Sequence, residues 1–190
     1  GGTTRALGTN PIAIGAPTGD DTPFVSDFAT TIIADGKIRL AQAQGAQLPP
    51  DYILDRDGNP STNPDDFFDG GSLLLAGGHK GYALSLATCL LSALTGAYDA
   101  EKKRVIGVFL MAIDIGAFRD TDAYARDARS FLDGITANPP APGVAKVLAP
   151  GEMEKRSRDE KTASGIDLPV VVWQRLCDGA AKVGASLPGE

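Results

Sequence analysis

The sequence predicts a mixed α/β protein (α+β-like) in which a mainly antiparallel sheet is flanked by helices. Segments with strand-like alternation are interleaved with segments of helical periodicity, and no regular strand–helix–strand repeat joins them. The 190 residues include 23 glycines and 13 prolines, which favours turns and short elements over a helical bundle. A chain of this length is expected to form one domain that buries roughly 70% of its unfolded surface.

Four strands are expected from apolar patterning and from the turns beside them. Residues 10–16 alternate after a Gly-Thr-Asn-Pro turn, and residues 23–28 follow the turn at residues 18–21. The long apolar run from Val105 to Asp114 predicts the central strand of the sheet. Residues 144–148 predict a further strand after a proline-rich connector.

Five segments have helical periodicity or helix-capping residues. They are residues 30–44 behind the caps Thr30 and Thr31, residues 79–95, residues 121–135 behind the cap Thr121, residues 152–164, and the segment after Pro169. The 79–95 helix is apolar on almost every side, so it is expected to be buried all round against the central strand. The last helix, which carries Trp173, is expected to leave the sheet and to expose an apolar face.

Charge and rare residue types exclude several classes of function. Lys and Arg total 18 against 24 Asp and Glu, so nucleic acid is not an expected partner. One histidine, His79, rules out metal sites that need two or three imidazoles, and no metal site is expected. The uncharged run at residues 81–97 is too short and too rich in small polar residues for a membrane span. Cys89 and Cys177 suit a reducing compartment, and no secretory signal is visible, so a cytoplasmic location is expected.

A glycine-rich stretch, Gly77-Gly78-His79-Lys80-Gly81, places His79 and Lys80 at the start of the 79–95 helix. Free backbone N–H groups and a lysine at such a position can bind an anion such as phosphate. The alternative is a solvated lysine after a glycine-rich loop, where the cation opposes the helix dipole slightly. Neither a P-loop nor a Gly-x-Gly-x-x-Gly motif is present, so the common phosphate signatures are missing.

Acidic residues stand at two further element ends. Asp27 lies at the end of the 23–28 strand, where a carboxylate can accept hydrogen bonds from both hydroxyls of a ribose. An Asx turn or a helix cap is the alternative for this residue. Glu152 follows Pro150-Gly151 at a helix start, where an acidic residue is favoured even without a ligand.

Several short motifs occur in a fixed order along nearly the whole chain. They are Gly8-Thr9-Asn10-Pro11-Ile12-Ala13, Asp27-Phe28-Ala29-Thr30, Gly36-Lys37, Leu48-Pro49, Asp55-x-Asp57-Gly58, Gly78-His79-Lys80-Gly81-Tyr82, Leu94-Thr95-Gly96-Ala97, Ala112-Ile113-Asp114 and Pro150-Gly151-Glu152. Together they resemble the second type of the malate/L-lactate dehydrogenase family. That family also includes ureidoglycolate, sulfolactate and diketogulonate dehydrogenases and Δ1-piperideine-2-carboxylate reductase.

The resemblance implies an NAD(P)-dependent oxidoreductase with a nucleotide-binding domain that is not a Rossmann fold. Carried over position by position, it implies cofactor contacts at Val25, Asp27, Phe28, Ala29, His79, Lys80, Gly151, Glu152 and Met153. The family's catalytic histidine, and the serine and arginine that hold the substrate carboxylate, lie upstream of Gly1. No catalytic residue is therefore expected in this chain. Some relatives carry a histidine near the substrate where Val108 stands here, which leaves the substrate open.

The resemblance also implies an organisation and a reaction. Residues 1–150 are expected to form the NAD(P)-binding domain, and residues 151–190 to supply helices that pack with an N-terminal domain absent from this chain. A homodimer is expected. The expected reaction is hydride transfer between the nicotinamide of NAD or NADP and a small 2-hydroxy or 2-oxo acid such as malate or lactate. The alternatives are reduction of a cyclic imino acid (Δ1-piperideine- or pyrroline-2-carboxylate) and a non-catalytic nucleotide-binding or dimerisation fragment.

Overall fold

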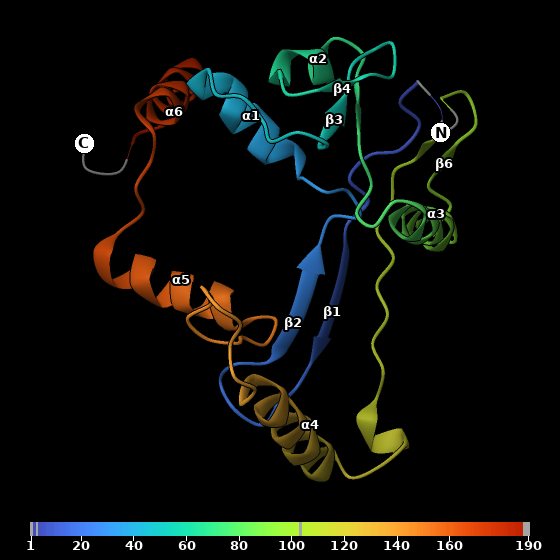
Figure 1. The fold of residues 1–190 in the computed structure, drawn as a ribbon, viewed down its shortest axis with the longest axis vertical. Helices are drawn as coiled ribbons and strands as arrows, with labels where there is room; N and C mark the ends of the chain where they lie inside the picture. The colour runs from blue at the N-terminus through green and yellow to red at the C-terminus, as the bar shows by residue number, and fades with distance from the viewer. Residues whose placement is uncertain (1, 3, 103, 188–190) are drawn as a thin grey trace.

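The structure is a computed structural model that describes residues 2, 4–102 and 104–187 (Figure 1). Its elements are β1 (Ile12–Ala16), β2 (Phe24–Phe28), α1 (Asp35–Gln44), β3 (Ile53–Leu54), β4 (Pro60–Ser61), α2 (Pro64–Phe68), β5 (Ser72–Leu73), α3 (His79–Ala93), β6 (Tyr98–Asp99), β7 (Arg104–Val105), the 3-10 helix η1 (Ile115–Ala117), α4 (Thr121–Thr136), α5 (Glu152–Ser164) and α6 (Val170–Val183). Every strand pairing in the described chain is antiparallel, which confirms the predicted class. The expectation of one sheet is wrong, because the strands form three small sheets: β1–β2, β4–β3–β5 and β6–β7.

The β1–β2 hairpin lies at the centre of the molecule, with α3 on one side and α5 on the other (Figure 1). Its register places Asp27 opposite Ala13. Directly opposite residues share a face of the hairpin, and successive residues alternate between faces. The face that carries Asp27 is formed by Ala13, Gly15, Val25 and Asp27. Both β1 residues on this face are small, so little side-chain volume stands beside the Asp27 carboxylate.

The densest packing lies in residues 30–76, which we call the packed region. Its core side chains are all less than a tenth exposed, and they are Ile33, Ile38, Leu48, Ile53 and Phe67. The N-terminal segment is fixed to this region by Arg5, whose guanidinium lies 3.9 Å from the centre of the Phe67 ring. Arg5 also donates hydrogen bonds to the carbonyl oxygens of Gly71 and Phe67.

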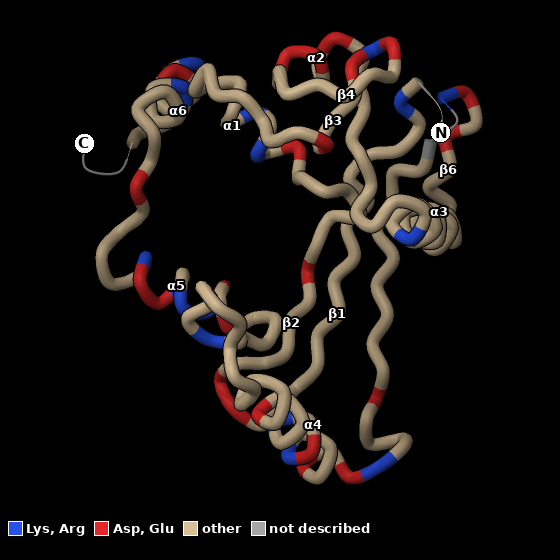
Figure 2. The backbone as a smooth tube through the Cα atoms, in the orientation of Figure 1, with Lys and Arg blue, Asp and Glu red and all other residues tan. Residues whose placement is uncertain are grey.

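Residues 106–118, which we call the open segment, correct the expectation of a central strand. Of the predicted strand, only Val105 lies in a strand, β7, and the Ile106 N–H adds one hydrogen bond to the Ala97 carbonyl oxygen at 3.1 Å. Residues 107–114 run extended beside the hairpin without joining a sheet (Figure 1). The run up to Ile113 carries no charge (Figure 2), yet Leu110 is 88% exposed. An apolar β-prone sequence predicts an extended backbone, but it cannot show which neighbour covers it. Residues 144–148 likewise form no strand.

Helix α3 forms where the sequence predicts it, but the expectation that it is buried all round is wrong. Its buried residues are the small ones, Gly81, Ser85 and Ser92, whereas Leu90 is 71% exposed. The helix contacts only the start of the predicted central strand, at β7 and Gly107, because the rest of that strand does not form. Its buried side faces the polypeptide around residues 10, 30 and 76 instead. Hydrophobic composition alone therefore does not show which side of the helix is in contact.

The other helices agree closely with the predicted spans but differ in how they begin. Helix α4 is capped by Asp120, whose carboxylate accepts from the Ala123 N–H at 2.7 Å, rather than by Thr121. Helix α1 begins only at Asp35, because Thr30 and Thr31 donate hydroxyl hydrogen bonds to neighbouring backbone carbonyls instead of capping it. In the described part of the chain, no helix combines the length and the apolar character needed to cross a bilayer.

The solvent-accessible surface of the chain is much larger than that of a compact monomer of the same mass. The chain exposes 13459 Å² for 19.6 kDa. A closed monomer of that mass would expose about 8,600 Å² and the unfolded chain about 28,400 Å². Only about half of the unfolded surface is therefore buried, and the expected roughly 70% is wrong. The large apolar side chains that stay exposed include several in the open segment and on the outer side of α3, and in α6 they are Val170, Trp173, Leu176 and Val183.

Candidate functional site

The end of β2 is connected directly to the start of α3. The carbonyl oxygen of Thr30, three residues beyond Asp27, accepts a hydrogen bond from the Ala76 N–H at 3.0 Å. Gly81 packs against the same two residues: a Cβ at this position would lie 2.9 Å from the Thr30 oxygen and closer still to that of Ala76. Because three residues of extended chain span about 10 Å, the Asp27 region and the His79–Lys80 turn are near neighbours.

The start of α5 meets the same strand at its other end. The Val25 N–H donates to the Pro150 carbonyl oxygen at 3.3 Å. Gly151, with a φ of +100°, approaches so closely that a Cβ would lie 2.9 Å from the Pro23 oxygen and 3.6 Å from the Val25 Cβ. The three segments predicted to contact a cofactor therefore all border one strand, within about 17 Å of extended chain between Val25 and Thr30.

Asp27 is exposed, and no described residue forms a hydrogen bond or an ion pair with its carboxylate. Asp27 is paired within β2 and caps neither a turn nor a helix, so the alternative of an Asx turn or a helix cap is not observed. Strand alternation places Val25 on the same face and Phe28 on the opposite face. A ligand on the Asp27 face could therefore contact only the backbone of Phe28, and Ala29 continues the strand towards Thr30.

The first turn of α3 presents cationic and polar groups to solvent. His79 and Lys80 are both exposed, and no described residue forms an ion pair with Lys80. Gly78 precedes the helix with a φ of +60°, and no side chain caps this end within the described chain. The N-terminal N–H groups of a 15-residue helix and an adjacent ammonium group together favour an anion.

The start of α5 is less open than the start of α3. The Glu152 carboxylate accepts from the Ala149 N–H at 3.3 Å and lies 3.7 Å from the Lys146 ammonium. Glu152 therefore stabilises its own helix start, as its position alone suggests. Met153 is exposed. Gly151, the residue before α5, approaches β2 closely because it has no side chain.

A cavity of about 650 Å³ lies beside the α3 start. Its lining includes Gly78, His79 and Tyr82 from α3 and its cap, Thr31 after β2, and residues 4–8 of the N-terminal segment. This volume is within the range of small-molecule sites. Across the described residues, no group of three or more His, Cys, Asp or Glu side chains could hold a metal ion.

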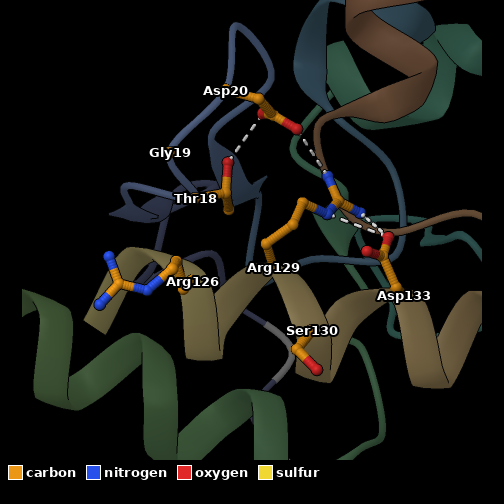
Figure 3. A pocket seen from close by; sticks show the side chains of 7 residues that line it. All are labelled: Thr18, Gly19, Asp20, Arg126, Arg129, Ser130 and Asp133. Atoms are coloured by element: carbon orange, nitrogen blue, oxygen red, sulfur yellow. Dashed lines mark hydrogen bonds and ion pairs between the residues drawn. The ribbon is translucent and has the colours of Figure 1, made fainter. Parts of the chain in front are cut away.

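A second hollow, of about 400 Å³, is built differently (Figure 3). Its centre is the Arg129 guanidinium of α4, which contacts Asp20 at 3.1 Å and Asp133 at 2.7 Å. The Thr22 N–H, the Thr18 hydroxyl and Arg129 hold the pKa of Asp20 below its ordinary value. These groups satisfy one another and fix the β1–β2 turn to α4, so this hollow is a structural contact rather than a binding site.

Three residues connect the site and were not assigned a role from the sequence. Thr9 accepts from both the N–H and the hydroxyl of Thr30, Asn10 contacts α3, and Gly81 allows α3 to approach Thr30. All three belong to the motifs that carry the resemblance. Their signal was therefore visible, but only the fold shows which segments they join.

Comparison with known proteins identifies a family and relatives that are similar to this chain. A family profile described as malate/L-lactate dehydrogenase matches residues 1–177. A malate dehydrogenase from Pyrococcus horikoshii is 32% identical over 97% of this chain and 55% of its own length. A Δ1-pyrroline-2-carboxylate/Δ1-piperideine-2-carboxylate reductase from Pseudomonas putida is 34% identical over 84% of this chain and 48% of its own length.

Solved structures agree with these sequence relatives. The sulfolactate dehydrogenase from Methanocaldococcus jannaschii superposes with a TM-score of 0.76 at 32% identity, covering 96% of this chain and 55% of that enzyme. The chain thus spans about half the length of the relatives it matches. Motif order, antiparallel pairing and overall similarity lead to the same conclusion: the chain belongs to the malate/L-lactate dehydrogenase family.

Proposed function

We propose that this chain supplies the cofactor-binding part of an NAD(P)-dependent enzyme that transfers hydride between nicotinamide and a small 2-hydroxy or 2-oxo acid. The observation that carries the proposal is that the three segments predicted to contact a cofactor all lie along β2. This strand connects a free carboxylate, Asp27, to the cationic start of α3 through Thr30 and Ala76. A dinucleotide carries both ribose hydroxyls and a pyrophosphate, and in this proposal one molecule meets both groups.

Each predicted residue has a role in this proposal. Asp27 accepts hydrogen bonds from the adenosine ribose, while Val25 and the backbone of Phe28 and Ala29 form the surface along β2. Lys80, His79 and the first N–H groups of α3 face the phosphates. The remaining contacts come from the start of α5, namely Gly151, Glu152 and Met153. The small residues Ala13 and Gly15 opposite β2 leave room on this face for the ligand.

The bound nicotinamide supplies a hydride acceptor or donor, and the carbonyl oxygen of a 2-oxo acid needs a proton when the hydride arrives. His79 is the only imidazole of the chain and stands at the proposed phosphate end. We therefore assign the general acid to a part of the protein outside these 190 residues. The proposed reaction converts a 2-oxo acid, a hydride and a proton into the 2-hydroxy acid.

The choice between NAD and NADP follows from what lies near the ribose. A carboxylate that accepts from the 2′-hydroxyl favours NAD, whereas a 2′-phosphate needs a nearby cation. Arg39 is already engaged, because it lies 2.6 Å from Asp35 and over the Phe68 ring. Lys37 is exposed and remains the candidate contact for a 2′-phosphate. NAD is the favoured cofactor, and NADP is the alternative.

A second reaction shares the same site. The Pseudomonas putida relative is named for reduction of cyclic imino acids, so a C=N bond is the alternative hydride acceptor. A non-catalytic nucleotide-binding or dimerisation fragment is the outcome if no part of the protein turns over. Assays of malate, lactate, sulfolactate and piperideine-2-carboxylate with the complete protein separate these alternatives.

The proposal also includes the organisation of the protein. Residues 1–150 form the nucleotide-binding domain, and the helices of residues 151–190 pack with a domain outside this chain. The exposed apolar side of α6, with Trp173 and Leu176, supports this packing. We propose a homodimer, which analytical ultracentrifugation tests. Both cysteines are free thiols, in keeping with the proposed cytoplasmic location.

The first test is Lys80→Ala in the complete protein. Loss of one charge-assisted phosphate contact should weaken NADH binding by roughly 1.5–3 kcal/mol, measured by fluorescence titration. Lys182→Ala, at the far end of α6, is the matched control and should bind as the unmodified protein does. Equal NADH affinity in both variants would remove Lys80 from the site.

The second test is His79→Gln. If His79 serves the cofactor, the Michaelis constant for NADH should rise by more than the rate constant falls, because binding and not proton transfer is impaired. Steady-state kinetics with the complete protein gives both quantities. A collapse of the rate constant with unchanged cofactor binding would instead make His79 the general acid.

A further inference from the structure

Residues Thr9 and Asn10 lie between the two halves of the proposed cofactor site. The Thr9 carbonyl oxygen accepts from the Thr30 N–H at 2.9 Å and from the Thr30 hydroxyl at 3.0 Å. The next side chain, Asn10, donates from Nδ2 to Ser85 Oγ at 2.7 Å and to Cys89 Sγ at 3.2 Å. Two adjacent residues therefore hold the end of β2 on one side and α3 on the other.

The geometry of Asn10 explains why asparagine stands there. Its φ of +37° is rare for residues with a side chain, and asparagine tolerates this region better than most. Its amide has two N–H donors, and both acceptors lie on one face of α3, one helical turn apart. Ser85 is 0% exposed, so loss of the amide would remove the partner of a buried hydroxyl.

Few other contacts fix this part of α3. Its inward-facing residues are small, and its large apolar residues, such as Leu86 and Leu90, are exposed. Gly81 permits the close approach to Thr30 and Ala76, but a missing side chain supplies no directional bond. The Asn10 amide does supply directional bonds, because its hydrogen bonds to Ser85 and Cys89 join the helix to the segment that leads into β1.

We propose that Asn10 is a positioning residue of the dinucleotide site, which fixes the spacing between the ribose-binding Asp27 and the phosphate-binding start of α3. The inference rests on the proposed function. It assigns Asn10 no contact with the cofactor. Its loss should therefore weaken only ligands that bridge both ends of the site, and ligands that touch one end should bind as before.

The test compares NADH with two fragments on the complete protein. Adenosine probes the Asp27 end, and inorganic pyrophosphate probes the α3 end. Asn10→Gly removes the amide but keeps the positive φ accessible. Asn10→Asp preserves shape and can still accept from the Ser85 hydroxyl, so it should rescue part of the effect. Asn138→Gly is the matched control, because the Asn138 amide also makes two hydrogen bonds, to Gly134 and Ile135 at the end of α4.

Displacement of a binding group by a fraction of an ångström to one ångström is costly for a bridging ligand. NADH affinity should fall about 10-fold or more in Asn10→Gly and less in Ser85→Ala, which keeps the Cys89 contact. Adenosine and pyrophosphate affinities, measured by saturation-transfer NMR, should stay within about 2-fold of the unmodified protein. Asn138→Gly should change none of the three affinities.

Three outcomes overturn the inference. Unchanged NADH affinity in both Asn10→Gly and Ser85→Ala shows that the amide does not set the spacing. An equal loss of adenosine, pyrophosphate and NADH binding shows general destabilisation instead of positioning. If the unmodified protein binds neither NADH nor NADPH, the proposed function itself fails, and that result is distinguishable from failure of the Asn10 assignment alone.

Discussion

The open segment is more apolar in sequence than the packed region, yet it is the packed region that becomes buried. Ile38 and Ile53 of the packed region are completely buried, whereas Leu110 of the open segment is 88% exposed. The packed region brings its own partners: α1, α2 and the β3–β5 sheet enclose one cluster. The open segment carries no charge up to Ile113 and runs extended without pairing with the hairpin (Figure 2).

The difference shows that an apolar segment becomes buried only when another part of the protein packs over it. Residues 30–76 alternate helix and strand over short distances, so they can close a core locally. Residues 106–118 and α6 need a surface that this chain does not contribute. The excess exposed area of the chain over a closed monomer is of the size of a large permanent interface. The matched relatives, about twice as long, have additional chain with which to cover it.

The largest expected effect comes from comparing Ile38→Ala with Leu110→Ala in the 190-residue chain. Ile38→Ala should lower the free energy of unfolding by about 2–5 kcal/mol, because it leaves a cavity in a closed core. Leu110→Ala should stay within about 0.5 kcal/mol. Urea denaturation followed by circular dichroism measures both. Comparable losses for the two variants would show that the open segment is buried after all.

The same pair in the complete protein sharpens the comparison. If another part of the protein covers the open segment, Leu110→Ala should there cost about 2 kcal/mol or more. A cost that stays near zero in the complete protein would mean that the segment is exposed in every context.

The next effect contrasts two helical glycines. Gly81→Ala would press a Cβ against the Thr30 and Ala76 carbonyls, so it should destabilise by about 1–3 kcal/mol and weaken NADH binding. Gly179→Ala, in an open position within α6, should stabilise by about 0.5–1 kcal/mol. Thermal unfolding of both variants checks the signs. Stabilisation by Gly81→Ala would refute the close contact of α3 with the packed region.

The smallest expected effect is a pH dependence at the contact between the β1–β2 turn and α4. Hydrogen bonds from Thr22 and Thr18, with Arg129, lower the pKa of Asp20 in the folded state. A lowered folded pKa contributes stability that is present above the unfolded value and is lost as the pH falls through the folded value. Asp20→Asn should therefore be less stable than the unmodified chain at pH 7, and the gap should close on acidification.

Unfolding midpoints measured from pH 7 downwards through the acidic range check this prediction, because the stability contributed by the lowered pKa of Asp20 is lost as the pH falls. Asp21→Asn, at the neighbouring exposed carboxylate, is the control and should leave the pH profile unchanged. A gap between Asp20→Asn and the unmodified chain that stays constant with pH would contradict the assignment.

The sequence predicted several local elements correctly, but it did not predict β3, β4, α2 and β5, and it predicted the pairing partners of the strands poorly. The spans of α3, α4 and α5 and the β1–β2 hairpin follow from periodicity and turn residues, which act over a few positions. The prediction of a central strand at residues 105–114 failed because strand pairing depends on a partner that is distant in the sequence. The prediction that α3 is buried on all sides failed because its contact face is made of Gly81, Ser85 and Ser92, which are not strongly hydrophobic.

The candidate site could be assembled from the sequence only through the order of its motifs. Local reasoning found an anion-binding helix start and a ribose-type carboxylate as separate possibilities. The backbone hydrogen bonds from Ala76 to Thr30 and from Val25 to Pro150 place these segments along one strand. Neither Asn10 nor Gly81 is a residue type that by itself indicates a role at this site, so their contribution is visible only in the folded chain.

The central claim is that three segments along β2 form one dinucleotide site. Amide hydrogen exchange of the complete protein, measured with and without NADH, tests it most directly. If the three segments form one site, NADH should protect residues 25–29, 77–82 and 149–153 together, while residues 18–20 and 126–133 around the Arg129 contact are unchanged. Protection of only one of the three segments, or protection centred on the Arg129 contact, would contradict it.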